Sequence, residues 1–406
     1  MRCGLLGKKL GHSYSPQIHS YLGCYDYMLF EKQPEELPSF LRSDSFSGIN
    51  VTIPYKKDVI PYLDILSDRA SELGAVNTIV RKQDGTLIGH NTDYFGFQSL
   101  LQRSGLNVAG KKVLVLGSGG ASATVVSVLK DASARVVIVS RGGSDNYGNL
   151  GQQIDASVIV NTTPVGMYPD VGLSPVDLSL FPNLEGVLDV VYNPARTQLL
   201  LDAEKRGLVA ENGLWMLVAQ AKESAEWFLG EKIPDDRIQQ IHSILQKQME
   251  NIILIGMPGC GKSTIGRILA ERLNRKFIDA DREIERISGI TIPEIFASSG
   301  EEGFRKIETE VLSQIAKESG YVIATGGGCV TKAENYALLH QNGRIFWLQR
   351  DLECLATDGR PLSQAGKLNE MYQIRKPIYE DFADYIVDNN GNTDNTVSAI
   401  LSLEVE

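Results

Sequence analysis

The stretch GMPGCGKST at residues 256–264 follows an apolar run, Ile252–Ile255, and precedes a segment with helical periodicity, Ile265–Leu273. It matches the pattern G-x-x-x-x-G-K-[ST] in the strand–loop–helix setting that this motif requires. Its glycines let main-chain N–H groups turn toward one anion, and the following helix N-terminus adds partial positive charge. We expect Lys262 to reach the terminal phosphates of a nucleotide and the Ser263 hydroxyl to ligate Mg²⁺. The alternative is a glycine-rich turn between two core elements.

The composition is that of a globular chain. Of 406 residues, 43% are hydrophobic and 22% are charged. Two or three domains are therefore expected, each able to bury its own core. The formal net charge of −10 argues against non-specific binding to nucleic acid or to an anionic membrane. Small anionic ligands would then be bound by local basic residues.

Cysteine usage predicts a reducing compartment. The five cysteines form no C-x-x-C pair and no zinc-type spacing with histidine, which is typical of free thiols. They are Cys3, Cys24, Cys260, Cys329 and Cys354. We find no secretory apolar region at the start and no uninterrupted apolar run of transmembrane length. A cytoplasmic location without a membrane segment is expected.

Short β-type runs alternate with helix-length segments, which predicts an α/β fold with mostly parallel sheets. The expected strands are Cys3–Leu6, Gly48–Ile53, Val113–Leu116, Val136–Ser140, Ser157–Asn161, Gly186–Val190, Ile252–Ile255, Val322–Thr325 and Arg344–Leu348. A helical segment at Asp93–Arg103 marks a hinge between domains. A second one, Asp235–Met249, runs almost directly into the next strand, and its connector has none of the Gly, Ser or Pro of a flexible tether. We expect the two halves to lie close together.

Residues 111–122 (KKVLVLGSGGAS) form a predicted strand that ends in glycines. A helix is expected at Ala123–Leu129 and a second strand at Val136–Ser140, which together make a βαβ nucleotide-binding unit. The third glycine of the G-x-G-x-x-G pattern is replaced by Ser122. Gly117 and Gly119 still permit the tight turn and the close approach of a pyrophosphate.

The end of that second strand indicates which dinucleotide is bound. NAD sites place a carboxylate there, whereas this chain has Ser140 and Arg141, with no carboxylate before Asp145. A cation at this point suits a 2′-phosphate, so the sequence favours NADP. The alternative is a solvated arginine on a loop.

Four small polar clusters occupy the first hundred residues. They are GHSYSP at 11–16, NVTIPYK at 50–56, GAVNT at 74–78 and GHNTD at 89–93. One such cluster alone is usually a capped turn. Four of them beside a dinucleotide-binding unit indicate a binding site for a polar substrate.

With these motifs, residues 1–247 resemble shikimate dehydrogenase, and NGLWMLVAQ at 212–220 adds to the match. The resemblance implies NADPH-dependent reduction of 3-dehydroshikimate to shikimate. It places the substrate carboxylate on Ser13 and Ser15. It assigns the ring hydroxyls to Asn77, Asp93 and Gln220, with Thr52 and Tyr192 nearby. The implied cofactor contacts are Gly117, Ser118, Gly119, Gly120, Ala121, Ser140, Arg141, Val190 and Gly213.

By the same resemblance Lys56 is the acid–base residue. Hydride transfer to a carbonyl carbon leaves an alkoxide that must be protonated, and a lysine ammonium stabilises that charge and delivers the proton. Asp93 can fix the position of the ammonium group. Without Asp93 and the neighbouring N-x-T, Lys56 would be interpreted as a surface lysine.

The second half carries further polar segments after the phosphate loop. They are FIDAD at 277–281, GEEGFR at 300–305, TGGG at 325–328, GRPL at 359–362 and RKPIY at 375–379. Asp279 and Asp281 end a predicted strand two residues apart, so we expect both on one face of it. The glycines at 326–328 predict a main-chain platform open to close ligand approach.

These segments, in this order, resemble shikimate kinase over residues 251–406. The resemblance implies that Ser263 and Asp279 hold Mg²⁺ and that Asp281 accepts the proton of the attacking hydroxyl. It implies shikimate binding by Asp281, Arg305, Gly327 and Arg375, and ATP binding by Gly259, Cys260, Gly261, Lys262, Ser263, Thr264 and the lid residue Arg360. Phosphoryl transfer depends on positioning and charge neutralisation, for which arginines and Mg²⁺ are suited.

Together the two resemblances imply a fused enzyme in which the product of the first reaction is the substrate of the second. We expect a substrate-binding domain at 1–95 and 213–247, an NADP-binding Rossmann domain at 96–212, and a P-loop kinase domain at 251–406. Two alternatives stay open: a sensor that binds such ligands without turnover, and a first half that uses quinate and NAD. The sequence fixes neither the oligomeric state nor the orientation of the halves.

Overall fold

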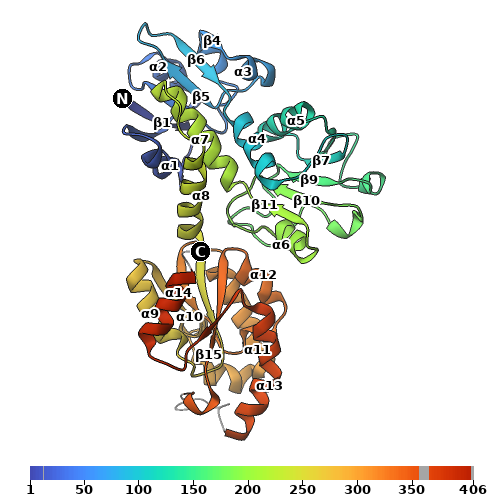
Figure 1. The fold of residues 1–406 in the computed structure, drawn as a ribbon, viewed down its shortest axis with the longest axis vertical. Coiled ribbons are helices and arrows are strands. Elements are labelled where there is room, and N and C mark those ends of the chain that lie inside the picture. Colours follow the sequence, from blue (N-terminus) through green and yellow to red (C-terminus); the bar gives the residue numbers. More distant parts are fainter. Residues whose placement is uncertain (12, 356–364, 404–406) are drawn as a thin grey trace. The chain divides into compact units, whose positions relative to one another are not determined.

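The computed structural model describes residues 1–11, 13–355 and 365–403. Over these ranges the chain forms three sheets, drawn in Figure 1, and divides into two compact units. The first unit comprises Met1–Val165, Ser174–Tyr192 and Asp202–Leu245. The second comprises Gly166–Leu173, Asn193–Leu201 and the chain from Gln246 onward. The predicted α/β class with parallel sheets is confirmed.

The first sheet of the first unit is mixed. Its strand order is β2-β1-β3-β5-β6-β4, with β1 (Arg2–Gly7), β2 (Asp26–Glu31), β3 (Gly48–Val51), β4 (Ile65–Leu66), β5 (Thr78–Arg81) and β6 (Leu87–His90). β1 is parallel to β2 and β3, whereas β5 is antiparallel to β3 and β6. The link between β5 and β6 is too short for a parallel crossover, so these two strands form a hairpin. Three helices accompany this sheet: α1 (Ser15–Leu22), α2 (Leu37–Arg42) and α3 (Asp68–Leu73).

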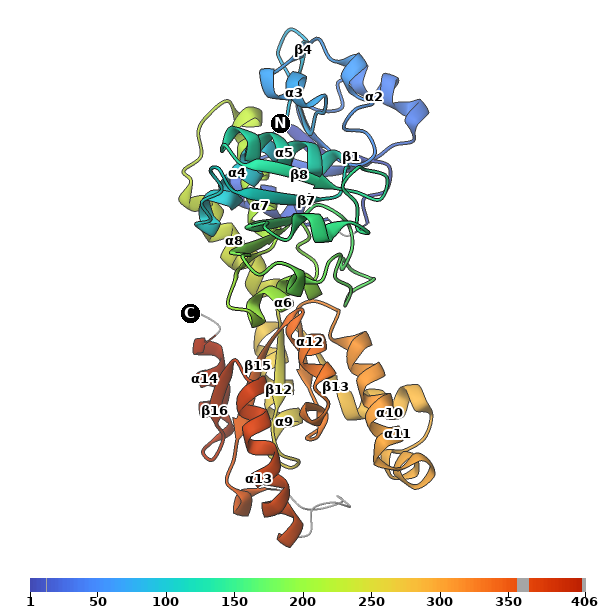
Figure 2. The ribbon, with the colours of Figure 1, turned by 90° about the vertical axis from the view of Figure 1, so that its right-hand side faces the viewer.

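The second sheet of the first unit is entirely parallel, in the order β11-β10-β9-β7-β8. Its strands are β7 (Lys112–Leu116), β8 (Arg135–Val139), β9 (Val158–Asn161), β10 (Gly186–Asp189) and β11 (Val209–Glu211). Helix α5 (Gly120–Asp131) packs on β7 and β8, as Figure 2 shows, and α6 (Gln198–Lys205) precedes β11.

Two packed helices of the first unit carry residues that are predicted to bind the substrate. α4 (Asp93–Ser104) packs closely along α7 (Leu214–Leu229). Their approach depends on Gly96, because a Cβ there would lie 2.8 Å from the main-chain oxygen of Met216. α8 (Asp236–Met249) follows, and only Glu250 separates it from the next strand.

The third sheet, in the second unit, is parallel in the order β13-β14-β12-β15-β16. Its strands are β12 (Asn251–Ile255), β13 (Lys276–Asp279), β14 (Tyr321–Ala324), β15 (Gly343–Gln349) and β16 (Tyr385–Asp388). The helices are α9 (Lys262–Leu273), α10 (Ala280–Ser288), α11 (Ile292–Ile315), α12 (Glu334–His340), α13 (Ala365–Phe382) and α14 (Thr393–Leu403). Figure 1 shows α9 and α14 on one side of this sheet and α12 and α13 on the other.

β12 is the central strand of this sheet, and its burial agrees with that position. Its residues Ile252–Ile255 are all 0% exposed, as expected for a central parallel strand covered on both faces. The chain places β13 and β14 on one side of β12 and β15 on the other, and because all pairs are parallel, the carboxyl ends of β12, β13 and β14 lie at one edge of the sheet. Ligands of open α/β sheets bind at such an edge.

Two helices begin earlier than predicted. α5 starts at Gly120 and not at Ala123, and α9 starts at Lys262 and not at Ile265. Apolar periodicity reports only the face that packs on the core. The first turns, Gly120–Ser122 and Lys262–Thr264, carry no large apolar side chain, so periodicity could not detect them.

Candidate active sites

Lys56 and Asp93 form an ion pair in the first unit. Nζ of Lys56 lies 2.6 Å from Oδ2 of Asp93, and the two side chains are 27% and 15% exposed. Asp93 is the first residue of α4, where a carboxylate is favourable beside the helix N-terminus. Lys56 lies five residues after the end of β3. The turn before it is closed by a hydrogen bond from the N–H of Tyr55 to the carbonyl of Thr52 at 2.9 Å. The pair holds one ammonium group in place near solvent.

Asn77 and Gln220 lie close to that pair. Oδ1 of Asn77 accepts from the N–H of Thr92 at 2.7 Å, and Nδ2 of Asn77 donates to Oγ1 of Thr92 at 3.0 Å. Gln220, on α7, places Oε1 3.5 Å from the same hydroxyl oxygen. Because Thr92 immediately precedes Asp93, the three predicted hydroxyl-binding side chains share one neighbour.

The serines and tyrosine predicted to flank the substrate are also in the first unit. Oγ of Ser13 accepts from the N–H of Ser15 at 3.2 Å, where the chain enters α1. The ring of Tyr14, between them, meets the ring of Tyr192 edge-on with centroids 6.2 Å apart. Burial raises the pKa of Tyr192, so it stays a neutral hydrogen-bonding group. Thr52 is partly buried, and its N–H donates to the carbonyl of Leu6 at 2.9 Å.

The glycine turn after β7 is built for close approach. Gly117 has φ of 107°, which favours glycine, and nothing lies within 4 Å of a Cβ placed on Gly119 or Gly120. Ser122, where the pattern expects glycine, donates from Oγ to the carbonyl of Gly117 at 2.8 Å and thereby ties the turn to α5. Ser118 and Ala121 lie in the same loop and first turn. This open turn at a helix N-terminus fits a pyrophosphate.

Two other predicted cofactor contacts lie in direct contact with each other. A Cβ on Gly213 would lie 2.1 Å from the main-chain oxygen of Val190, so only glycine fits there. At the end of β8, the N–H of Ser140 donates to the carbonyl of Asp145 at 3.1 Å, which makes a turn, and Arg141 on that turn is exposed. An exposed guanidinium at this strand end is available to a phosphate.

The phosphate loop of the second unit surrounds Lys262. Nζ of this buried lysine donates to the carbonyls of Gly256 at 2.8 Å and Met257 at 3.0 Å. Gly259 and Gly261 have φ of 84° and 97°. Cys260 is buried, its main-chain carbonyl accepts from Asn389, and Thr264 lies in the first turn of α9. The loop therefore wraps around the ammonium group of Lys262 at the carboxyl end of β12.

Asp279 and Ser263 meet directly, but the predicted placement of Asp281 on the same strand face was wrong. Oγ of Ser263 donates to Oδ2 of Asp279 at 2.6 Å. β13 ends at Asp279, which caps α10, and Asp281 is in the first turn of that helix. The carboxylate of Asp279 accepts from a main-chain N–H of the first turn, so the chain leaves the strand two residues earlier than an alternation argument assumes.

The glycines after β14 bring the predicted acceptor-binding groups together. A Cβ on Gly326 would lie 2.8 Å from Oδ1 of Asp281, and a Cβ on Gly328 would lie 2.0 Å from Nη2 of Arg305. The carbonyl of Gly327 accepts from Nη1 of Arg375 at 3.1 Å. Both arginines and one aspartate therefore lie against this three-glycine segment.

Sequence reasoning missed Glu308, which supports Arg305. Nη1 of Arg305 donates to Oε2 of Glu308 at 2.7 Å, and Glu308 is fully buried. Burial raises the pKa of Glu308, an effect that the Arg305 charge only partly offsets. Burial also opposes the charge on Arg305, but the carboxylates of Glu308 and Glu301 outweigh it and raise the pKa of the guanidinium. The spacing of three residues on one helix was the available signal.

Nε of Arg305 has no hydrogen-bond partner among the described residues, although the atom is buried. A buried charged donor of this kind is suited to an anionic ligand. Arg360, predicted to approach the transferring phosphoryl group, lies outside the described residues. Among the described residues, no helix combines the length and the apolar composition of a membrane-spanning segment.

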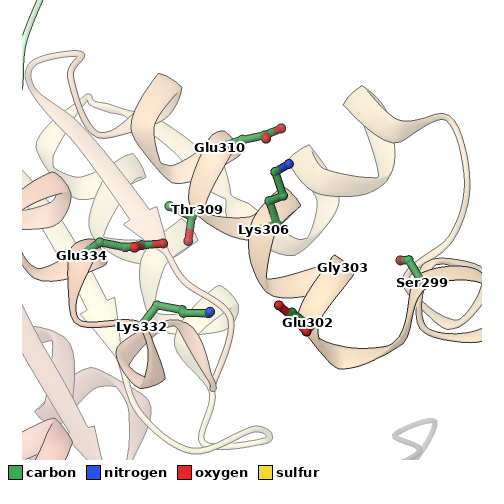
Figure 3. A pocket seen from close by; sticks show the side chains of 8 residues that line it. All are labelled: Ser299, Glu302, Gly303, Lys306, Thr309, Glu310, Lys332 and Glu334. Atoms are coloured by element: carbon green, nitrogen blue, oxygen red, sulfur yellow. The ribbon is translucent and has the colours of Figure 1, made fainter.

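A surface pocket of about 490 Å³ lies beside α11 (Figure 3). Lys306 and Glu310 from α11 face Lys332 and Glu334, at the start of α12, across it. Charges of both signs alternate around this pocket, and it contains none of the predicted site residues. The candidate kinase site is therefore placed at the phosphate loop and not at this pocket.

Two family models match the chain. The model described as the shikimate dehydrogenase substrate binding domain matches residues 5–79, and the model described as shikimate kinase matches residues 258–404. Among curated proteins, the shikimate dehydrogenase (NADP(+)) of Clostridium perfringens strain ATCC 13124 is 37% identical over 265 residues, which covers 60% of this chain and 97% of that protein.

Solved structures give the same picture for the first half. A chorismate mutase/shikimate 5-dehydrogenase fusion protein from Clostridium acetobutylicum has a TM-score of 0.58 at 36% identity, covering 61% of this chain and 97% of that one. A quinate dehydrogenase from Corynebacterium glutamicum in complex with NAD has a TM-score of 0.55 at 27% identity, covering 59% and 98%.

Proposed function

The chain belongs to the shikimate dehydrogenase family over its N-terminal 60% and carries a shikimate kinase domain after it, and we propose that it performs two consecutive reactions. The first half reduces 3-dehydroshikimate to shikimate with NADPH. The second half transfers a phosphoryl group from ATP to shikimate, giving shikimate 3-phosphate. The protein is thus a bifunctional enzyme of the shikimate pathway.

In the reduction, Lys56 supplies the proton. Bound NADPH provides the hydride, and hydride addition leaves negative charge on the carbonyl oxygen. The Lys56 ammonium, held by Asp93 at 2.6 Å, stabilises that charge and protonates the oxygen. Asn77 and Gln220 bind ring hydroxyls beside the pair, while Ser13 and Ser15 bind the carboxylate.

The cofactor residues fit a dinucleotide with a 2′-phosphate. The turn from Gly117 to Ala121 leaves room at Gly119 and Gly120, where the N-terminus of α5 meets the pyrophosphate. The exposed guanidinium of Arg141 pairs with the 2′-phosphate. Ser140, Val190 and Gly213 complete the groove by close main-chain contact.

In the phosphorylation, the second unit orients two charged reactants. Lys262 and the main-chain N–H groups from Gly259 to Thr264 bind the ATP phosphates. Arg305 and Arg375 bind the carboxylate of shikimate, beside the carbonyl of Gly327. Asp281 accepts the proton of the attacking hydroxyl, and Arg360 neutralises the transferring phosphoryl group.

Mg²⁺ fits the oxygen pair of Ser263 and Asp279. The hydroxyl and carboxylate oxygens already lie 2.6 Å apart, and hard oxygen ligands with substrate phosphates are what this cation prefers. Bound Mg²⁺ would neutralise phosphate charge.

We assign the division of labour to three regions. Residues 1–95 and 213–247 bind the dehydrogenase substrate, residues 96–212 bind NADP, and residues 251–406 form the kinase domain. The partners are small molecules, and the proposed location is the cytoplasm.

One observation carries the proposal: two families whose reactions share shikimate occur in one chain, and in each half the groups expected to react lie together. In the first half these groups are Lys56 and Asp93. In the second half Arg305 and Arg375, which are expected to bind the acceptor, lie against the same glycine segment.

Separate assays of the two half-reactions test it. Dehydrogenase rates are measured with NADP⁺ or NAD⁺ on shikimate or quinate, and kinase rates from ADP release with shikimate and Mg²⁺-ATP. We expect shikimate with NADP⁺ to be preferred, and Arg141→Ala to reduce that cofactor preference about tenfold through loss of one charge-assisted contact. A preference for quinate and NAD⁺, or ADP release that ignores shikimate, would contradict the proposal.

A further inference from the structure

A cluster of buried polar side chains lies behind the proposed hydroxyl-binding residues of the first unit. Its exposed fractions run from 0% to 5%, although every member carries hydrogen-bonding groups. The members are Asn50, Asn77, Thr78, Thr92 and Ser224. They come from β3, β5, the segment before α4, and α7. Such a cluster is stable only if its donors and acceptors are matched.

Ser224 is the centre of this cluster. Its Oγ lies 2.7 Å from Nδ2 of Asn50, 2.8 Å from Oγ1 of Thr78 and 2.9 Å from Oγ1 of Thr92. It also donates to the carbonyl of Gln220, one helical turn earlier, at 2.9 Å. No water is needed to account for these contacts.

The direction of most of these hydrogen bonds is fixed by chemistry. Nδ2 of Asn50 faces the carbonyl of Asn77 at 3.4 Å, and Oδ1 of Asn50 accepts from the hydroxyl of Tyr27 at 2.8 Å, so Asn50 must donate to Ser224. The carbonyl of Gln220 can only accept, so it receives the single Ser224 proton. One acceptor position on Ser224 is left, and Thr78 and Thr92 compete for it.

The other threonine proton has Oδ1 of Asn77 within reach, besides the contact of the two threonine hydroxyls with each other at 3.2 Å and the longer one from Thr92 to Oε1 of Gln220 at 3.5 Å. Oγ1 of Thr78 and Oγ1 of Thr92 each lie 3.2 Å from Oδ1 of Asn77. The orientation of the Asn77 amide is set as well, because its oxygen faces the N–H of Thr92. By accepting from one threonine, Ser224 limits which threonine proton is left for Asn77.

Through these contacts Ser224 links the three proposed hydroxyl-binding side chains. Gln220 shares its helix turn, Asn77 is held by the threonine protons, and Asp93 follows Thr92 directly. These side chains come from different elements of the fold. The Oγ atom of Ser224 contacts Thr92, which lies next to Asn77 and Asp93, and the main chain of Gln220.

We propose that Ser224 is a positioning residue for the dehydrogenase reaction, which sets the amide and carboxylate groups that recognise the ring hydroxyls of the substrate. This role rests on the proposed dehydrogenase function. Ser224 does not contact the substrate itself. It acts through Asn77, Thr92 and Gln220.

The test is Ser224→Ala, assayed on shikimate and on its two analogues that each lack one non-reacting ring hydroxyl. Removing the hydroxyl leaves buried donors unpaired and lets the Thr92 hydroxyl shift together with the Asn77 amide that it contacts, so we expect kcat/KM for shikimate to fall about tenfold, mainly through KM. For at least one analogue the fall should be much smaller, because the group that Ser224 positions has nothing to bind there.

Two controls separate positioning from general loosening. Ser104→Ala removes a hydroxyl that also donates to a carbonyl of its own helix, but far from the cluster, and should leave all three substrates unchanged. Thr78→Val removes a second hydroxyl of the cluster at nearly constant volume and should give the same selective pattern. If Ser224→Ala does not fold, the kinetics of Thr78→Val test the proposal in its place.

Equal fold-losses on shikimate and both analogues would show a merely structural role and overturn the proposal. Unchanged kinetics in Ser224→Ala would overturn it too. Failure of the proposed function is distinguishable, because the unmodified protein would then lack shikimate-dependent NADP⁺ reduction.

Discussion

Lys56 and Lys262 are both assigned to negative charge, yet the protein holds them differently. Lys56 is paired with the carboxylate of Asp93 at 2.6 Å, whereas Lys262 is buried among main-chain carbonyls at 2.8 and 3.0 Å. A neutralised, positioned ammonium suits the transfer of one proton. A lysine among neutral groups keeps its full charge for a polyphosphate. The same residue type is thus placed beside a carboxylate in the first half and among neutral carbonyls in the second.

The largest effects should come from removing each lysine. Lys56→Ala should lower dehydrogenase kcat/KM by about a thousandfold or more, because proton transfer and alkoxide stabilisation are both lost. Lys262→Ala should reduce kinase activity by a similar factor. Each variant should keep the other activity, measured on the same preparation. Loss of both activities in either variant would contradict two independent sites.

A smaller effect is expected at the buried pair of the second unit. Glu308→Gln leaves Arg305 without its fully buried carboxylate, which should destabilise that unit by about 3 kcal/mol and raise KM for shikimate in the kinase reaction. Dehydrogenase activity should be unchanged. Glu310→Gln, on an exposed face of the same helix, is the matched control. An unaltered unfolding transition would show that the pair is not coupled to stability.

Acid should weaken the first unit through its buried histidines. Burial lowers the pKa of His19 to about 3 and the pKa values of His90 and His242 to about 4. The unfolded chain binds these protons near pH 6.5, so the stability from keeping the rings neutral is present above that pH and is lost as pH falls. His19 is stacked on Tyr27 and hydrogen-bonded to Tyr25. Its protonation in the unfolded chain should lower the free energy of unfolding by about 2 kcal/mol between pH 7 and pH 5.

Calorimetry of the whole chain at pH 7 and pH 5 measures this. The transition that shikimate with NADP⁺ stabilises should move down more than the transition that ATP stabilises. In the second unit the raised pKa of Glu308 works in the opposite direction, since its charged form is the disfavoured one. Equal shifts of both transitions would contradict this assignment.

The smallest effect is expected at the cofactor turn. Ser122→Ala removes the hydrogen bond from Ser122 to the carbonyl of Gly117, worth about 1 kcal/mol, and should raise KM for NADP⁺ about fivefold. Kinase kinetics serve as the internal control. A lower KM would mean that the hydroxyl hinders the turn instead of holding it.

The sequence predicted best where main-chain geometry demands a residue type. The glycines of the phosphate loop and of the turn after β7 have positive φ or open space, so their spacing alone located both loops. The parallel sheets followed from alternation of strand and helix. The β5–β6 hairpin was missed because no strand was predicted at Thr78–Arg81 or at Leu87–His90.

Contacts between distant elements were not predictable. Asp281 was placed on a strand because alternation cannot see that Asp279 caps a helix. Ser224 meets Asn50 and Thr78 only because α7 packs on the first sheet, and no local pattern encodes that approach. Glu308 could have been found from its spacing to Arg305, although its burial could not.

One coupled measurement tests the central claim that a single chain carries shikimate through both reactions. The full-length protein is supplied with 3-dehydroshikimate, NADPH and Mg²⁺-ATP, and products are followed by mass spectrometry. We predict one NADPH oxidised and one ATP consumed for each shikimate 3-phosphate formed, with shikimate as the intermediate that accumulates in Lys262→Ala. NADPH oxidation without any phosphorylated product from the unmodified chain would contradict the account.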